Sequence, residues 1–579
     1  MSETIKPFKA GEARIIVQSE GKETDFSALL SSATVTEEFG RISSAELVFD
    51  DGGFDDEDFQ VANSDEMLVG RQIEIRLGYD DDAECVFKGI VIRQRVVISR
   101  ERKELRVSVR HDAVKMSRVR MTRNFKDMTD SDLIKSIVSE YGITAEVDDT
   151  DAQHEVMCQY GATDWDFVNL RAEANGQLLF CSPSGIVSHA PDIHAEPVLE
   201  IDNGFNLISL DAEIDGTVSF DSYAARTWNF VSREEESEEV QAGEFDTELG
   251  DQTSSVLSSA LGNQKQNMDF DRMQPDTDAM VSLNKSVMML GGLSRINGRI
   301  SFPGHHSVHP GDLVKLGNLG TRFNGNAFVS AVVHDFADGL WTTELTFGLD
   351  DTRFAEKYDN ISPLPAAGAL PSVSGLQVAV VEQLADDPLG EDRILVRLFG
   401  GDDLTVWARL ATLNAGNERG VCFIPEVGDE VVVGFINDNP NLAVVLGSLH
   451  GSANVSPVQI DDDNFKKGFY SKEKIKLEFD DEKKSVSIET PGGNKLMLSD
   501  DAKGITLEDQ NGNKIVMNDS GISIESAKDL VVKASQNLSE EGNNVELKAN
   551  ASFKATGNSG AEVSTSGSAV LKGSIVQIN

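Results

Sequence analysis

Apolar and polar residues alternate in short runs near the start of the chain. These runs are separated by turn residues and lie at 14–17, 45–49, 72–77, 85–92 and 105–109. Alternation with a period of two, broken by turns, is typical of half-buried strands in a barrel or sandwich. Similar runs recur at 298–302, 312–316, 327–334 and 341–347. The pattern predicts a mainly β protein.

Two short helices are predicted between these sets of strands, near residues 129–175. The first begins after Thr129, whose side-chain oxygen can accept a hydrogen bond from a free amide of the first turn. Its apolar residues recur at helical spacing, and Gly142 stands where a left-handed residue ends such a helix. The second is expected to begin after Thr163 and to end at Gly176.

Residues 232–290 have a different composition. Arg233 is followed by five glutamates within Glu234–Glu239, and a stretch rich in Ser, Gln and Asp comes next. Such a segment buries little apolar surface, so we predict a partly ordered acidic insertion. The glutamate run is interpreted as a solvated loop, with a partner-binding role as the alternative.

Two linkers are predicted to divide the rest of the chain. Residues 362–374, rich in Pro, Ala and Gly, end the first region at residue 361. Residues 375–451 then carry dense short strands with tight turns, which suits a small Greek-key barrel. A second linker is expected at 452–471, before a repeat that occupies 472–579.

In this repeat, apolar residues two apart recur about every ten residues at first and about every eight later. A short, regular period predicts stacked strands, because each strand buries one face only against its neighbours. The residues predicted to form the core are Leu477, Phe479, Val486, Ile488, Leu496, Leu498, Ile505, Leu507, Ile515, Met517, Ile522, Ile524, Leu530, Val532, Val545, Leu547, Leu571 and Ile578.

One chain cannot close a β-helix with this repeat, because a coil with three walls needs roughly 20 residues or more. Three chains wound around one axis can each supply a wall and leave no strand edge unpaired. About twelve strands per chain at roughly 4.8 Å spacing would form a prism about 60 Å long. We therefore predict an intertwined triple-stranded β-helix, a homotrimeric needle whose rigidity suits piercing.

Charge excludes several functions. The chain has 97 acidic and 52 basic residues, and its net charge of -45 repels nucleic-acid phosphates and anionic headgroups. Nucleic-acid binding and electrostatic adhesion to membranes are therefore not expected. No run approaches the roughly 20 apolar residues of a membrane-spanning helix, and the N-terminus lacks a secretory signal. We expect cytoplasmic synthesis.

Residues that could carry chemistry are scattered, and no catalytic, cofactor or metal site is predicted. Cys85, Cys158, Cys181 and Cys422 form no CxxC pair and are interpreted as reduced core residues. The spacing of His305, His306 and His309 fits no standard zinc site, so a surface loop is predicted rather than a metal centre. Gly-rich residues 317–325 lack the Lys-Ser/Thr of a phosphate loop and are predicted to be a hairpin loop.

The predicted small barrel resembles a known family. Val406-Trp-Ala-Arg-Leu410, residues 420–435 and residues 444–449 resemble the OB-fold barrel of VgrG-like spike proteins of contractile injection systems. Residues 1–361 resemble the tail-hub region of the same family, including Thr163-Asp-Trp-Asp-Phe167 and the turn at His309-Pro-Gly-Asp312. The residues that carry the barrel signature are Trp407, Arg409, Pro425, Gly428, Asp429 and Gly434.

This resemblance implies a hub of two β-barrels, an OB barrel and a needle, assembled as a homotrimer. It also implies a hexameric inner-tube protein and baseplate proteins as partners, effector cargo, and ejection of a phage-tail-like particle's spike into a target cell. No histidine follows His450, so a tip metal is not expected, and a separate PAAR-like tip protein is predicted instead. Members from phage tails, extracellular injection systems and type VI secretion fit equally well.

Two other functions compete with a non-enzymatic spike. A trimeric glycan-binding tailspike or adhesin has a similar composition, but its grooves need aromatics, and the repeat has few. A spike that carries an enzyme would need an extra domain, for which the second linker leaves no room.

Overall fold

The structure is a computed structural model that describes residues 11–52, 59–100, 102–269, 277–400 and 403–578. It divides into two compact units, residues 1–374 with 435–442 and residues 375–434 with 443–579. Predictions made for residues 1–7 and for part of the acidic insertion, 270–276, lie outside the described residues. Within the described residues, no helix is long and apolar enough to span a bilayer.

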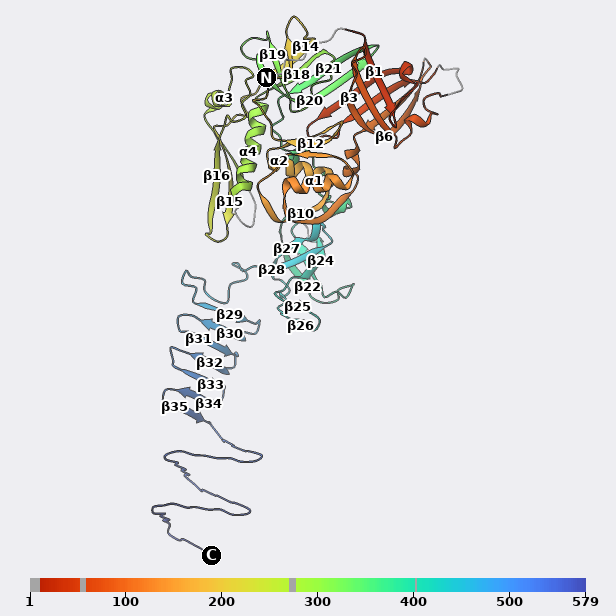
Figure 1. Cartoon of the computed structure of the whole chain (residues 1–579). Helices are drawn as coiled ribbons and strands as arrows, with labels where there is room; N and C mark the ends of the chain where they lie inside the picture. Colours follow the sequence, from red (N-terminus) through yellow and green to blue (C-terminus); the bar gives the residue numbers. More distant parts are fainter. Residues whose placement is uncertain (1–10, 53–58, 101, 270–276, 401–402, 579) are drawn as a thin grey trace. The chain divides into compact units, whose positions relative to one another are not determined.

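A 13-stranded sheet dominates the first unit (Figure 1). The predicted strands near the start of the chain are confirmed, and a strand that the sequence pattern missed, β3, joins them. This half of the sheet consists of β1 (Ala13–Ser19), β2 (Lys22–Glu23), β3 (Leu30–Glu38), β4 (Ser44–Asp50), β5 (Gln72–Tyr79), β6 (Glu84–Ile98) and β7 (Lys103–Arg110).

The later strands complete the same sheet, because β20 pairs antiparallel with β3. Each half has its own apolar core: one includes Leu47, Phe49 and Ile73, and the other includes Phe302 and Phe347. The later half consists of β13 (Leu199–Asp202), β14 (Ser209–Ile214), β18 (Ile296–Pro303), β19 (Leu313–Gly317), β20 (Gly325–Ala337) and β21 (Leu340–Phe347).

Both predicted helices are confirmed. α1 (Asp130–Glu140) begins after Thr129 and α2 (Asp164–Ala174) after Thr163, and each threonine side chain accepts a hydrogen bond from an amide of the first turn. The helices pack on small sheets built from β8 (Arg120–Thr129), β9 (Ala145–Val147), β10 (Gln153–Thr163), β11 (Leu178–Ser182) and β12 (Gly185–His189).

The described part of the acidic insertion forms strands and helices, so the interpretation of its glutamate run as a solvated loop was wrong. Its glutamate run forms a strand, β16 (Glu234–Gln241), which pairs with β15 (Ser222–Asn229). β17 (Lys265–Asp269) pairs with the other side of β15, and α4 (Thr277–Ser294) packs on β15 and β16. The buried core here includes Tyr223 and Met288, which are distant in sequence. α3 (Ser254–Leu261) completes the insertion.

The histidine cluster lies in a loop, as predicted, but one of its members is not on the surface. His305 is buried, and its ring lies 5.7 Å from the ring of His306, which stacks on Trp341. His334 of β20 is also buried and lies within 3.0 Å of the Thr343 hydroxyl. Among the described residues, no three His, Cys, Asp or Glu side chains are placed to hold a metal.

The cysteines have no disulfide partner, but only Cys181 is fully buried; Cys158 and Cys422 are exposed, which corrects their interpretation as core residues. The glycine-rich segment 317–325 is a loop between the antiparallel strands β19 and β20, as predicted. After it, α5 (Phe354–Lys357) and a 3-10 turn (Pro365–Gly368) lead to the end of the first unit.

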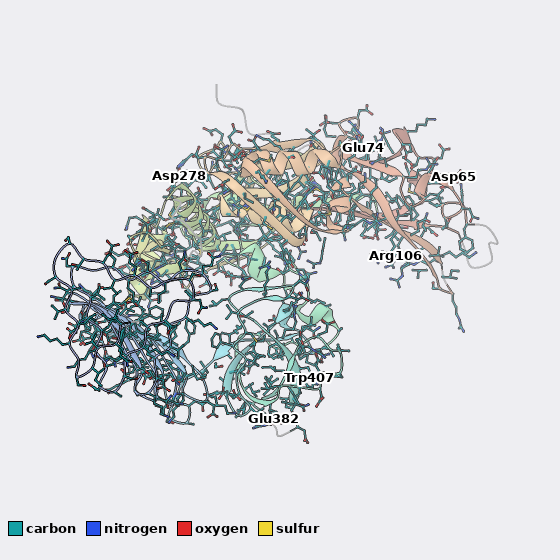
Figure 2. The ribbon with its side chains drawn as sticks, turned by 90° about the horizontal axis from the view of Figure 1, so that it is seen from below. Asp65, Glu74, Arg106, Asp278, Glu382 and Trp407 are labelled. Carbon is teal, nitrogen blue, oxygen red and sulfur yellow. The ribbon has the colours of Figure 1, made fainter. Side chains whose placement is uncertain are left out.

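The second unit begins with a closed five-stranded barrel, which contains Glu382 and Trp407 (Figure 2). Small apolar residues such as Val381, Val396 and Val433 fill its interior. Its strands are β22 (Gln377–Gln383), β23 (Ile394–Leu398), β24 (Thr405–Leu410), β27 (Glu430–Phe435) and β28 (Ala443–Ser448). A short hairpin, β25 (Ala415–Gly416) with β26 (Arg419–Gly420), extends from it.

Candidate functional site

A ladder of seven short antiparallel strands follows the barrel (Figure 1). It starts earlier than predicted, because β29 lies within the proposed linker 452–471. Each strand is five residues long: β29 (Lys466–Tyr470), β30 (Lys476–Asp480), β31 (Ser485–Glu489), β32 (Lys495–Ser499), β33 (Gly504–Glu508), β34 (Lys514–Asn518) and β35 (Gly521–Glu525).

The register brings the predicted core residues of these strands onto one face of the ladder. Leu477 lies opposite Ile488, which lies opposite Leu496, and Leu507 continues this row. A second row runs through Phe479, Val486, Leu498, Ile505, Met517 and Ile522 in the same way. Side chains of alternate residues share a sheet face, so both rows form one continuous apolar surface.

A single copy of the chain leaves this apolar face uncovered. Leu498 is 45 % exposed, Leu507 51 % and Ile524 57 %. Of the described residues from 466 onward, Asp480 alone is buried. Burying a Leu or Ile side chain is worth about 1.5–3 kcal/mol, so a ladder with this face in water lacks its main source of stability.

Beyond β35 the predicted strands do not form in one copy. The described residues from 526 to 578 contain no strand, and the predicted core residues Leu530, Val532, Val545, Leu547, Leu571 and Ile578 are all more than half exposed. A strand needs a neighbour for its backbone hydrogen bonds, and this segment has none within its own chain. One copy forms seven of the strands, and the prediction of about twelve strands per chain in a trimer stays a prediction.

The apolar face is also concave. A groove of about 640 Å³ runs over β31 to β35 and is lined by Ile488, Leu496, Leu507, Ile515, Ile524 and Leu530 among others. A groove lined by aliphatic side chains from every strand suits a protein segment of the same apolar character better than a polar ligand.

The residues of the predicted barrel signature hold one turn together. Gly428, at φ +93°, donates its amide proton to the Val381 carbonyl at 2.8 Å, and the Asp429 carbonyl accepts from the Val381 amide at 2.9 Å. The Asp429 carboxylate accepts from the Glu426 amide at 2.8 Å, and Pro425 is buried beside it. These contacts join β27 to β22 and close the barrel.

The other signature residues lie on the barrel wall. Trp407 is half-buried opposite Leu395, while Arg409 is exposed opposite Val444. A side chain at Gly434 would meet Leu376 and Leu446. These six residues shape a barrel, and they form no catalytic cluster.

Sequence reasoning missed two buried charge networks in the first unit. The Asp130 carboxylate accepts hydrogen bonds from Arg171 at 2.6 and 2.7 Å and from Asn175 at 2.9 Å, and lies 2.9 Å from His154 Nε2. The Arg295 guanidinium, 2 % exposed, donates to the Asp246 carboxylate and to backbone carbonyls of Thr247 and Gln252. Both networks join segments distant in sequence, which no local motif reveals.

Three family models match the chain. The Alg8 N-terminal domain matches residues 9–338, which is more than half of the chain. The type VI secretion system/phage-baseplate injector OB domain matches residues 377–450, the closed barrel. The phage baseplate V C-terminal trimerisation domain matches residues 485–579, which include most of the ladder and the segment beyond it.

A curated relative is the type VI secretion system spike protein VgrG5 of Pseudomonas aeruginosa, 34 % identical over 99 residues. The match covers 16 % of this chain, and the chain spans about one eighth of the relative's length, 12 %.

The chain is also partly similar to solved structures of tail and spike proteins. The 43 kDa tail protein of prophage MuSo2 from Shewanella oneidensis has a TM-score of 0.46 and 12 % identity, over 58 % of this chain and 99 % of that one. The E. coli c3393 protein, a type VI secretion component, has a TM-score of 0.38 and 12 % identity, over 75 % and 99 %. The Francisella PdpA-VgrG complex has a TM-score of 0.37 and 9 % identity, over 89 % and 88 %.

The order of an Alg8-type N-terminal domain, an injector OB barrel and a baseplate trimerisation domain agrees with the resemblance stated from the sequence. The chain therefore belongs to the family of the Alg8 N-terminal domain, and its injector OB domain and baseplate trimerisation domain support its resemblance to VgrG-like spike proteins.

Proposed function

We propose that this protein is the homotrimeric central spike of a contractile injection machine and pierces the target envelope mechanically. The observation that carries the proposal is the apolar face of the ladder, which one chain leaves in water. Two further copies supply the missing cover, turn the two rows into a dry axial core, and provide neighbours for the segment from 526 to 578. The matched trimerisation domain covers the same residues and supports this assembly.

In this proposal the first unit is the hub that adapts a hexameric inner tube to the threefold needle. The first unit has two separate apolar cores on one continuous sheet, which supports this role. Each core marks one half of the sheet, so three copies of the chain would present six halves to a hexameric tube. The baseplate surrounds the hub. The protein is made in the cytoplasm, joins a tail-like particle, and is ejected with the tube.

Exposed apolar side chains near the far end of the needle support a further partner there. Ile575 is 80 % exposed and Ile578 is 84 % exposed. We propose that a PAAR-like tip protein covers this end, and that effector cargo is carried with it.

The spike acts without catalysis in this proposal. The signature residues of the barrel form a turn and the barrel wall, and the apolar residues of the ladder form a packing surface. In the histidine cluster, His306 stacks on Trp341. The contracting machine supplies the force for piercing, and this protein is the rigid needle that transmits the force.

The experiment is reconstitution with the tube and tip proteins encoded beside this chain. The full-length protein should cap tubes at one end in electron micrographs and should retain the tip protein in gel filtration. Cleavage of oligosaccharide or peptidoglycan by the pure protein, or a monomer that binds oligosaccharide, would contradict the proposal and favour a tailspike.

A further inference from the structure

Two hairpins of the first unit carry dense charge of opposite sign. Residues 93–106 contain six basic and two acidic residues in a chain whose net charge is -45. They form the outer part of the hairpin between β6 and β7, which includes Arg106 (Figure 2). The other hairpin joins β15 to β16 and carries the five glutamates of Glu234–Glu239. We define these as the basic hairpin and the acidic hairpin.

The basic hairpin holds like charges together. Arg95 lies directly opposite Arg106 in the strand register, an arrangement that destabilises a sheet unless an anion is near. Glu104 lies within 2.8 Å of Arg102 and 2.9 Å of Arg106 and compensates them. Arg93 and Arg95 are exposed and have no carboxylate partner among the described residues. With six basic and two acidic residues, the basic hairpin carries four positive charges in excess.

Apolar side chains accompany this charge. Val96 is 47 % exposed and Ile98 is 55 % exposed, on the strand that carries Arg93 and Arg95. Val96 and Ile98 lie on the opposite face of the strand from Arg93 and Arg95, because successive side chains alternate between faces. The outer hairpin therefore offers a charged face and an apolar face for contact, and arginine is enriched in protein interfaces.

The acidic hairpin offers the matching chemistry. Trp228 is 52 % exposed and lies directly opposite the exposed Glu235. An aromatic face beside a carboxylate suits a guanidinium, which stacks on the ring and pairs with the acid. Phe230 and Val231 at the turn are also exposed, and the outer edge of β16 has no paired strand among the described residues.

Only some of the glutamates of β16 have a partner in the same unit. Glu239 pairs with Lys265 at 2.6 Å, and Glu236 accepts from Asn229. Glu234 and Glu235 are exposed and have no basic partner among the described residues. Residues 233–239 contain five glutamates and one arginine, so they carry four negative charges in excess, opposite in sign to the basic hairpin.

The two hairpins belong to different sheets of the first unit. The basic hairpin is formed by β6 and β7 of the 13-stranded sheet. The acidic hairpin is formed by β15 and β16 of a separate three-stranded sheet, which lies in the chain between β14 and β18. Four strands separate β18 from β7, which is about 24 Å across at roughly 4.8 Å per strand. One copy cannot close this distance, but neighbouring copies in a ring present opposite ends to each other.

We propose that the basic hairpin of each hub docks on the acidic hairpin of the next copy, with Arg93 or Arg95 against Trp228 and Glu235. This inference rests on the proposed trimer and names the contact that closes its hub. Three identical contacts of this heterologous kind complete a ring. The contact explains why uncompensated charge of both signs is kept on one chain.

The test uses the full-length chain with Cys158 and Cys422 replaced by Ser and with Arg95→Cys and Glu235→Cys introduced together. Mild oxidation should give covalent trimers on a denaturing gel. Mixing chains that carry only one of the two cysteines should give covalent dimers and no trimers. Absence of both products in a protein that sediments as a trimer would overturn the inference and leave the proposed function standing.

Charge reversal provides the second arm. In the cysteine-paired protein, Arg93→Glu should slow cross-linking by about tenfold, and adding Glu234→Arg should restore it, because complementary charge governs the association. Arg118→Glu, an exposed reversal without an ion-pair partner in the described chain, is the matched control and should change nothing. If Arg93→Glu leaves cross-linking intact and instead abolishes tube binding, the basic hairpin contacts the tube protein, and the inference is wrong.

Discussion

At the scale of single residues, Asp130 carries a charge inside the hub. Burial alone would raise the pKa of its carboxyl, but hydrogen bonds from Arg171, His154 and Asn175 outweigh burial and hold the pKa well below its usual range. A carboxyl with a lowered pKa stabilises the fold above its unfolded pKa of about 3.9, and this stability is lost as the pH falls.

Replacing Asp130 leaves the half-buried Arg171 guanidinium without its counter-charge. We expect Asp130→Asn to lower the free energy of unfolding of the first unit by about 3 kcal/mol, measured by urea denaturation at pH 7.5. Asp132→Asn, on the exposed side of the same helix, is the control and should change it by less than about 0.5 kcal/mol. Equal effects of the two changes would show that the buried network does not stabilise the hub.

His334 makes the hub sensitive to acid. Burial, and then the nearby His309, His306 and His305, lower the pKa of His334 to about 3. Unfolded histidine takes up a proton near pH 6.5, so its contribution is present above pH 6.5 and is lost progressively down to pH 3.

Between pH 7.5 and pH 5, His334 alone should cost the folded hub about 2 kcal/mol. His334→Gln should remove that part of the pH dependence in urea titrations at the two pH values. His194→Gln, an exposed histidine of the same unit, should leave the pH dependence unchanged. A wild-type hub whose stability does not fall over this range would contradict the assignment.

A single residue could be predicted where its contacts are close to it in the sequence. Thr129 and Thr163 were identified as helix caps because a cap bonds to an amide three residues away. His305 was misplaced because its amide donates to the hydroxyl of Thr343 and its ring lies against His306, which stacks on Trp341. Thr343 and Trp341 are more than thirty residues away in the sequence.

At the scale of elements, the ladder allows a comparison of neighbouring residues on its two faces. Leu507 lies on the apolar face of β33, and Thr506 lies on the opposite face of the same strand. We expect Leu507→Asp to abolish the trimer at micromolar concentration, because three carboxylates would meet in a dry core. Thr506→Asp should keep the trimer, and both variants are compared by light scattering after gel filtration. A trimer that tolerates Leu507→Asp would show that this face is not the interface.

The barrel turn provides a separate test of the signature. Gly428 has φ +93°, a conformation that a residue with a Cβ adopts only with strain. Gly428→Ala should lower the free energy of unfolding of the barrel unit by about 1–2 kcal/mol, measured by thermal denaturation. Gly447→Ala, a glycine of β28 with no atom near a built Cβ, should cost much less. Similar losses at both positions would contradict the role assigned to the turn.

Elements were predictable where their own pattern sets their structure. The apolar residues of β30 to β35 were assigned to one face from spacing alone, and the register confirms that face. The glutamate strand β16 was missed because a solvent-exposed edge strand covered by α4 on one face has no apolar alternation of its own. The segment from 526 to 578 was predicted as strands that one copy does not form.

At the scale of the whole molecule, the order of hub, barrel and needle was predicted from the barrel residues 406–449 and the terminal repeat, and the matched families agree with that order. The continuous sheet through both halves of the hub was not predictable, since β3 and β20 are separated by almost three hundred residues. Assembly could not be read from one chain, because in the proposed trimer the partners of Leu507 and Leu530 are on other copies.

Sedimentation equilibrium of the full-length protein over a dilution series tests the central claim most directly. One chain has a mass of 62.9 kDa. If two further copies cover the apolar face of the needle, the measured mass should be three times that value at every concentration. The reason is that the single chain is not stably folded without its partners, so the trimer does not dissociate into folded single chains. A folded species of 62.9 kDa with its strand signal intact would contradict the account.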